Sequence, residues 1–204
     1  MIFVKQYAPP PVRMDEILRY AAAKRGGENV RTLAQECLAE AEKCLSYQIC
    51  YKEFSLTRLE KGIDLSFCKI ESKTLEFALS GCSEILLFAA TLGIGFDRLI
   101  ARYSHTSPAR AWMLQAVGAE RIEALCDSFC FDLKSEKNKS GKTVTPRVSP
   151  GYGDIPLAMQ GDIFQALDCH RSIGLALNSS FIMSPTKSVT ALVGIKQESC
   201  YEHP

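Results

Sequence analysis

The sequence predicts an α+β fold, a single domain in which helices flank a largely antiparallel, mixed sheet. Helical and strand patterns follow one another without the strict strand–helix–strand rhythm of a parallel sheet. The chain has 204 residues, 47% of them hydrophobic, which suffices for one core that buries roughly 70% of the unfolded surface. No internal repeat or linker divides it. We expect one domain over residues 1–204, with an extended arm (1–14), a folded body (15–196) and a tail (197–204).

Composition argues against several classes of protein. The formal net charge is +1, whereas a broad surface for nucleic acid or anionic membranes needs a basic face. The N-terminus has no basic segment followed by an apolar one, so we expect no signal peptide. The longest nearly apolar run, Ile85–Phe96, is far shorter than the ~20 residues of a membrane helix. The sequence therefore predicts a soluble, cytoplasmic protein.

The nine cysteines favour neither a metal site nor a disulfide framework. Their number is odd, and no two of them form a CxxC pair. Small apolar thiols on buried faces, in a reducing cytosol, are the simpler interpretation. The three histidines indicate no zinc or iron site. Whether the cysteines have a redox role stays open.

The first third of the chain predicts an arm and two helices. The prolines at 9–11 close the arm, and Asp15 is placed to cap a short helix. Gly26 and Gly27 end that helix, and Asn29 starts the next. Over residues 30–47 one stripe recurs at helical spacing: Leu33, Cys37, Ala41 and Leu45.

The middle of the chain then changes to strand patterns. Residues 47–60 roughly alternate, and after Gly62 the segment 63–70 is expected to be their antiparallel partner. A short helix is expected over residues 72–79. Residues 84–91 form a short apolar run that is typical of a buried strand.

Two further helices are predicted after this strand. The first covers residues 96–104. The second, over residues 107–131, is the longest, because Ser107 offers an N-cap and Pro108 a proline in the first turn. The polar segment 134–141 is expected to be a solvated loop.

The last sixty residues differ in composition from the rest of the chain. Residues 147–157 are too dense in proline and glycine for regular structure throughout. A helix is expected over residues 158–168. Residues 173–183 and 188–196 favour two strands, separated by a turn at Ser184–Pro185.

The segment 147–157 has the residue types of a ligand-binding loop. Arg147 offers a planar, two-pronged donor for a carboxylate. Gly151 and Gly153 allow backbone conformations and close approaches that side chains prevent, and the ring of Tyr152 suits a flat or cationic ligand. These features fit a zwitterionic or sulfonium ligand. A tight Pro–Gly turn with a surface arginine is the alternative that these residues alone leave open.

The same segment carries a family pattern. Arg147, Gly151 and Tyr152 match the Arg-x-x-x-Gly-Tyr signature of the activation (reactivation) domain of vitamin B12-dependent, that is cobalamin-dependent, methionine synthase, and residues 183–196 resemble its Met-x-Pro-x-x-Ser-Val turn and following strand. The segment 90–93 and the helix around Glu123 are similar to short, stand-alone relatives of that domain. The resemblance covers residues 15–196, is strongest over the last sixty, and implies the fold of the methionine synthase activation domain.

The resemblance also implies a site for S-adenosylmethionine. Arg147 corresponds to the arginine that pairs with the carboxylate of the methionine moiety. The backbone at Ser149 and Gly151 corresponds to ligand contacts, with Tyr152 beside the ligand. Glu123, on the preceding long helix, matches a glutamate near the positively charged ligand.

Other family positions match less directly. Glu120 is the alternative to Glu123, and Tyr201 corresponds by spacing to a further ligand-contacting tyrosine. An acid shortly before the arginine has no counterpart here, and Asp154 is the candidate to replace it in recognising the amine. The family's aspartate near the start of the domain has no identifiable position. No catalytic residue and no metal ligand is expected.

The implied function is that of an S-adenosylmethionine-binding reactivation component of a cobalamin-dependent methionine synthase. One-electron reduction of cob(II)alamin, coupled to methyl transfer from S-adenosylmethionine, restores methylcobalamin, and the protein contributes proximity and orientation. A corrinoid-bearing methionine synthase subunit would carry the cobalamin, and a flavodoxin- or ferredoxin-like protein would donate the electron. A reactivator of another corrinoid methyltransferase, or a non-catalytic S-adenosylmethionine-binding or docking subunit, are the alternatives.

Two other motifs point elsewhere. The apolar run before Gly93 and Gly95 is similar to the glycine loop of Rossmann-type methyltransferases, although the third glycine and the following acid are missing. That interpretation requires an open, parallel sheet. The segment Asp168–Gly174 approaches the Asp-x-His-x-x-Gly motif that ligates cobalamin, but its glycine is one residue late. We expect His170 to lie at a helix end instead.

Overall fold

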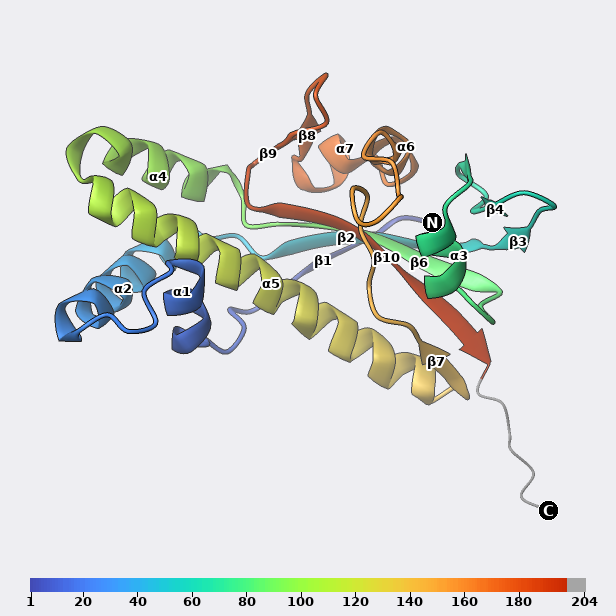
Figure 1. Ribbon diagram of the computed structural model, residues 1–204, viewed down its shortest axis with the longest axis horizontal. Coiled ribbons are helices and arrows are strands. Elements are labelled where there is room, and N and C mark those ends of the chain that lie inside the picture. Colours follow the sequence, from blue (N-terminus) through green and yellow to red (C-terminus); the bar gives the residue numbers. More distant parts are fainter. Residues whose placement is uncertain (198–204) are drawn as a thin grey trace, which may run out of the picture.

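A five-stranded sheet forms the centre of the computed structural model, which describes residues 1–197 (Figure 1). The strand order is β1-β2-β6-β10-β7, and every neighbouring pair is antiparallel. The α+β fold with a largely antiparallel sheet is therefore confirmed. The strands are β1 (Phe3–Gln6), β2 (Gln48–Ser55), β6 (Glu84–Thr91), β7 (Lys142–Val144) and β10 (Ser188–Gln197).

This sheet excludes the Rossmann-type alternative. The apolar run before Gly93 is strand β6, as predicted, but β6 has antiparallel neighbours on both sides, β2 and β10. A dinucleotide-type sheet is mostly parallel, because its crossover helices return the chain to the same edge. Gly93 directly precedes helix α4 (Ile94–Thr106), and Gly95 lies in the first turn of that helix.

The two faces of the sheet are covered by different helices. Successive side chains of a strand point to opposite faces, so the apolar run in β6 supplies both. Ile85, Leu87 and Ala89 pack with α3 (Lys73–Ala78), α6 (Met159–Ala166) and α7 (Cys169–Ile173). Leu86, Phe88 and Ala90 pack against α5 (Pro108–Asn138). The central strand is thus buried on both faces, which explains why it is almost entirely apolar.

A third core lies beyond one end of the sheet. It joins the N-terminal half of α5 to α1 (Met14–Tyr20), α2 (Glu28–Ala41) and α4. In Figure 1 these helices form the left part of the molecule, and α5 runs from them diagonally across the sheet. The long helix therefore belongs to two cores, and its C-terminal half is the part that lies against the strands.

The N-terminal arm is extended, as predicted, but its first residues are a strand of the main sheet. Phe3–Gln6 pairs with residues 48–51 of β2, and the ring of Phe3 stacks on Tyr51. The expected capping residues each lie two positions too late. Arg13 rather than Asp15 precedes α1, and Gly27 rather than Asn29 precedes α2. Asp15 lies in the first turn of its helix, where its negative charge interacts favourably with the positive end of the helix dipole.

The prediction that residues 63–70 pair with residues 47–60 is only partly correct. β3 (Thr57–Arg58), β4 (Ile63–Asp64) and β5 (Lys69–Ile70) form a separate small antiparallel sheet. Strand β2 does not take part in it, and pairs instead with β6 along its whole length and with β1 over residues 48–51.

The prediction of a solvated loop over residues 134–141 is wrong, because α5 continues to Asn138. Leu133 is buried against the sheet, and the ammonium of Lys137 lies 2.6 Å from a carboxylate oxygen of Glu53 on β2. These contacts outweigh the polar composition that suggested a loop. Within the described residues, no helix is both long and apolar enough to cross a membrane.

The strand expected over residues 173–183 is also wrong. Ile173 ends α7, and Gly174 closes that helix in a left-handed conformation. The side chain of Asn178 then accepts backbone hydrogen bonds of 2.9 Å from Ser180 and Ile182. This local turn folds the segment into a hairpin of β8 (Ala176–Leu177) and β9 (Met183–Ser184). His170 is the second residue of the short helix α7 and is exposed.

Candidate functional site

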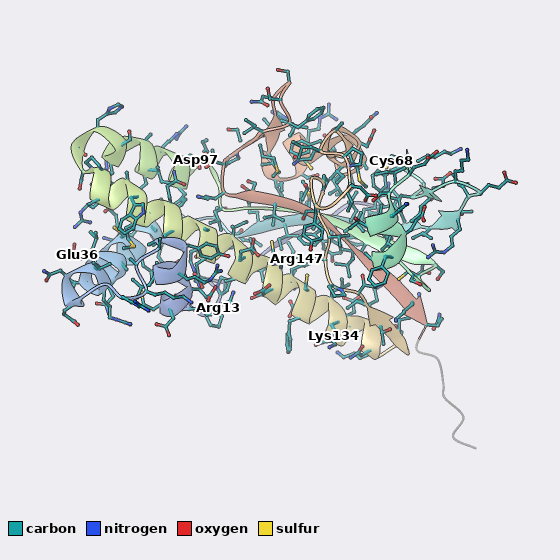
Figure 2. The ribbon with its side chains drawn as sticks, in the orientation of Figure 1. Arg13, Glu36, Cys68, Asp97, Lys134 and Arg147 are labelled. Carbon is teal, nitrogen blue, oxygen red and sulfur yellow. The ribbon has the colours of Figure 1, made fainter. Side chains whose placement is uncertain are left out.

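Arg147 is positioned by backbone pairing with β10. Thr145 donates its N–H to the Gly194 carbonyl at 2.9 Å, and Val148 exchanges hydrogen bonds of 2.9 and 3.0 Å with Leu192. The segment after β7 therefore runs along the edge of the sheet. Val148 packs into the core below the sheet, and the neighbouring Arg147 points to the opposite face, where α5 lies. Figure 2 shows Arg147 beside the middle of α5.

Two acids on α5 receive the guanidinium of Arg147. Its Nη2 donates to Glu123 Oε2, and its Nη1 donates to Asp127 Oδ1 at 3.0 Å. Glu123 and Asp127 are four residues apart, so they occupy the same face of the helix one turn from each other. Two of the predicted site residues, Arg147 and Glu123, are thus brought together across 24 residues of sequence. Both acids raise the pKa of Arg147, against the opposing effect of its burial.

A cleft of about 490 Å³ opens next to this cluster. Its size is within the range of small-molecule sites in proteins. One wall comes from α5 and the other from the segment after β7, with β10 at its base, and both charged and aromatic side chains face it. The lining residues are Asp127, Cys130, Phe131, Lys134, Val144, Thr145, Pro146, Arg147 and Val193.

The loop that follows Arg147 is held by its own backbone. Tyr152 donates its N–H to the Ser149 carbonyl, and Gly151 donates to Ile155 at 2.9 Å. Gly151 has a φ of 86° and Gly153 one of 59°, conformations that side-chain-bearing residues adopt only with strain. A Cβ on Gly153 would also lie 2.4 Å from Thr74 Oγ1. The two glycines are therefore required by the loop's own geometry, and Gly151 has its carbonyl, not its N–H, to offer a ligand.

The other predicted site residues have different surroundings. Tyr152 is 67% exposed, and within the described part of the chain neither it nor Ser149 or Gly151 lines the cleft. Glu120 is fully buried and pairs with Arg121 at 2.6 Å, which leaves Glu123 as the glutamate beside Arg147. Tyr201 lies outside the described residues.

Asp154 has a structural role at the start of α3. Its carboxylate accepts hydrogen bonds from the Ser72 hydroxyl and from the backbone N–H groups of Lys73 and Thr74. These bonds hold the pKa of Asp154 well below its usual range. The carboxylate thus joins the loop after Arg147 to a helix on the other face of the sheet.

Sequence reasoning missed two charged residues of this cluster. Asp127 carried a signal, namely its spacing of four residues from Glu123 on a predicted helix. Arg13 carried none. Its Nη2 lies 3.0 Å from Asp127 Oδ2, so Asp127 is held by arginines from both sides although 114 residues separate it from Arg13.

The family model described as "Vitamin B12 dependent methionine synthase, activation domain" matches residues 78–203. This span is more than half of the chain and includes the long helix, the arginine loop and the last strand. The chain belongs to this activation-domain family. The expected membership is thereby confirmed.

A solved structure shows the same fold. The chain matches a structure described as the MetH reactivation domain bound to AdoHcy, with a TM-score of 0.64 and 18% identity. The match covers 98% of this chain and 80% of the other, so the two share one fold. Comparison with curated protein sequences gives no significant match.

Proposed function

We propose that this activation-domain protein binds S-adenosylmethionine in the cleft beside Arg147 and supports the reductive methylation of cob(II)alamin in a partner protein. The observation that carries the proposal is the position of Arg147. A guanidinium at the wall of a cleft, in a family named for methionine synthase activation, is the expected anchor for the carboxylate of an amino-acid ligand.

The residues of the cleft fit such a ligand. S-adenosylmethionine carries one carboxylate, one ammonium and one sulfonium group, so its net charge is +1. Arg147 can pair with the carboxylate, and Glu123 and Asp127 beside it supply two carboxylates that can face the ammonium and sulfonium groups. Phe131, Val144 and Val193 supply apolar surface for the uncharged part of the ligand.

The protein's contribution would be binding and orientation. Arg147 would hold the carboxylate. Glu123, Gly151 and Tyr152 are outside the cleft lining, so they would meet parts of the ligand that extend beyond it: Glu123 the sulfonium, and the Gly151 carbonyl and the Tyr152 ring the side next to the loop. When bound, S-adenosylmethionine supplies the methyl group, and the cobalt of the partner's cobalamin receives it after one-electron reduction. No side chain has to transfer a proton in this reaction, which agrees with a cluster built for charge pairing.

The partner and the electron donor belong to the same proposal. A corrinoid-bearing methionine synthase subunit would present the cobalamin, and a flavodoxin- or ferredoxin-like protein would reduce it. The name of the family supports the first of these, since it describes a domain of a cobalamin-dependent enzyme.

Titration calorimetry of the purified chain with S-adenosylmethionine tests the first step, with Arg147→Ala measured beside it. Binding by the wild type that the variant loses supports the proposal, and Arg171→Ala, on the exposed side of α7, is the matched control. If the wild type does not bind alone, the titration is repeated with the cobalamin-loaded partner. Absence of binding there contradicts the proposal.

The second step is tested by the absorption change of methylcobalamin formation with the reduced partner. Binding without methylcobalamin formation would favour a docking subunit instead.

A further inference from the structure

Asp127 stands at the wall of the cleft, and Glu123 does not. Both carboxylates contact Arg147, but only Asp127 is among the described residues that line the hollow. Its side chain is 50% exposed, compared with 36% for Glu123. A ligand group that enters the cleft beside Arg147 therefore meets Asp127 first.

Asp127 also has acceptor capacity left. An ionised carboxylate offers about four acceptor positions on two oxygens. Arg147 uses one on Oδ1 and Arg13 uses one on Oδ2, each at 3.0 Å. A further donor can therefore be accepted without breaking either ion pair.

The contact from Arg13 is fixed by the fold. The buried guanidinium of Arg121 donates to the carbonyls of Pro10 and Pro11 at 2.7 and 2.9 Å. Its partner Glu120 accepts the backbone N–H of Arg13 at 3.0 Å. Three hydrogen bonds thus fasten residues 10–13 to α5, and the side chain of Arg13 reaches Asp127 from there. Asp127 keeps this second partner when Arg147 turns towards a ligand.

The chemistry of an amino-acid ligand specifies what Asp127 would meet. In an α-amino acid, the carboxylate and the ammonium are bonded to the same carbon, so their protein partners must be close neighbours. The carboxylate anchor Arg147 has Asp127 at 3.0 Å, inside the same cleft. We propose that Asp127 recognises the α-ammonium group of the ligand and makes the site specific for an amino acid over a ligand without the amine. This inference rests on the proposed function, in which Arg147 holds the ligand carboxylate.

The test compares three ligands with the full chain by titration calorimetry. S-adenosylmethionine carries both cationic groups, S-adenosylhomocysteine keeps the ammonium without the sulfonium charge, and the 2-oxo analogue of S-adenosylmethionine keeps the sulfonium without the ammonium. Asp127→Asn preserves the shape of the side chain. We expect it to reduce the affinity for the first two ligands about ten- to hundredfold, the range for a hydrogen bond between charged groups. Binding of the 2-oxo analogue should stay the same or become tighter, because Arg147 loses a competing acid.

Two variants provide the comparison. Glu123→Gln should reduce the affinity for S-adenosylmethionine and for its 2-oxo analogue by similar factors, since both ligands carry the sulfonium. Asp132→Asn removes another aspartate of α5, one that pairs with Lys5 outside the cleft, and should leave all three affinities unchanged. Binding of the 2-oxo analogue to Asp127→Asn also shows that the variant is folded.

Each contrary outcome has a separate meaning. If Asp127→Asn reduces the affinity for the 2-oxo analogue as much as that for S-adenosylmethionine, or reduces neither, the proposal that Asp127 recognises the ammonium group is wrong. If the wild type binds the 2-oxo analogue as tightly as S-adenosylmethionine, the site does not recognise an amine, while the proposed function stands. If the wild type binds none of the three, alone or with its partner, the proposed function itself is wrong.

Discussion

Arg147 donates a hydrogen bond of 3.0 Å to the carboxylate of Asp127. This contact joins the edge of the sheet to the long helix and stands at the wall of the cleft. The same guanidinium also reaches Glu123. The arginine of the sequence signature is therefore paired with acids before any ligand enters, so a ligand carboxylate has to share Arg147 with them. Ligand binding should consequently depend on the charge and geometry of this cluster.

Replacement of Arg147 tests that dependence. Arg147→Ala should weaken S-adenosylmethionine binding about tenfold or more, because a charge-assisted hydrogen bond contributes about 1.5–3 kcal/mol. Arg147→Lys should recover only part of the loss, since an ammonium cannot form the two-pronged pair. Calorimetric dissociation constants measure both. Equal affinity of a folded Arg147→Ala variant and the wild type would contradict the assigned anchor.

Tyr152 should matter less than Arg147. Its side chain is 67% exposed, so its removal leaves no buried group without a partner. We expect Tyr152→Ala to reduce S-adenosylmethionine affinity by a smaller factor than Arg147→Ala, and Tyr152→Phe to resemble the wild type because the ring is retained. The same titrations measure this. A larger loss for Tyr152→Ala than for Arg147→Ala would reverse the order of importance.

The glycines of the arginine loop should differ from Gly141 in their effect on stability. All three positions have positive φ, but an added Cβ meets nothing within 4 Å at Gly141, whereas at Gly153 it lies 2.4 Å from Thr74 Oγ1. Gly141→Ala should cost about 1–2 kcal/mol of unfolding free energy, the cost of the left-handed conformation alone. Gly153→Ala should cost clearly more, because the contact between the loop and α3 must also give way. Urea unfolding of both variants checks the order, and equal losses would contradict it.

Arg121 should be essential for stability. Its side chain is fully buried with Glu120, and it holds the backbone of Pro10 and Pro11. Arg121→Ala should cost about 3–5 kcal/mol, since it leaves the carboxylate of Glu120 buried without its pair. The double variant Arg121→Met with Glu120→Gln should unfold at a higher temperature than Arg121→Ala. Thermal unfolding measures both, and a loss below about 1 kcal/mol for Arg121→Ala would show that the pair is dispensable.

Asp154 should make stability depend on pH in the acid range. Hydrogen bonds from the Ser72 hydroxyl and from the backbone N–H groups of Lys73 and Thr74 lower the pKa of Asp154 in the folded state. A carboxyl with a depressed folded pKa stabilises the protein above its unfolded pKa of about 3.9 and loses that effect as pH falls further towards the folded value. The stability difference between wild type and Asp154→Asn should therefore be constant at neutral pH and shrink below about pH 4. Urea titrations at pH 7, 5, 4 and 3 measure it. If the stability difference between the wild type and Asp154→Asn does not change with pH, the charge of Asp154 does not contribute to stability.

The sequence was most informative where local pattern and burial agree. The run at 84–91 is apolar at nearly every position, and the structure has a strand there that is buried on both faces. The helical stripe of Cys37 and Ala41 is buried in the helical core. The short helix expected over residues 72–79 is α3, and the hydroxyl of Ser72 caps it. The signature around Arg147 identified the family, which the match over residues 78–203 confirms.

Hydrophobic periodicity failed where contacts of specific side chains or strand edges decide the conformation. The polar composition of residues 134–141 predicted a loop, yet the helix continues to Asn138, where Lys137 pairs with Glu53. Residues 173–183 read as a strand, but the side chain of Asn178 turns the chain. The arm became a strand because β2 presented an open edge. In each case the deciding partner is a specific group whose position cannot be read from periodicity.

The sequence by itself determined the antiparallel α+β fold and the family, and it pointed to Arg147 and Glu123 as candidate site residues. Hydrophobic periodicity and a short motif encode these features locally. Only the tertiary structure decided that Asp127 stands beside Arg147 and that Arg13 holds it from the other side. The reason is physical: an ion pair forms between groups that the folded backbone brings within about 3–4 Å, and a separation of 114 residues says nothing about that distance until the sheet and the long helix have packed.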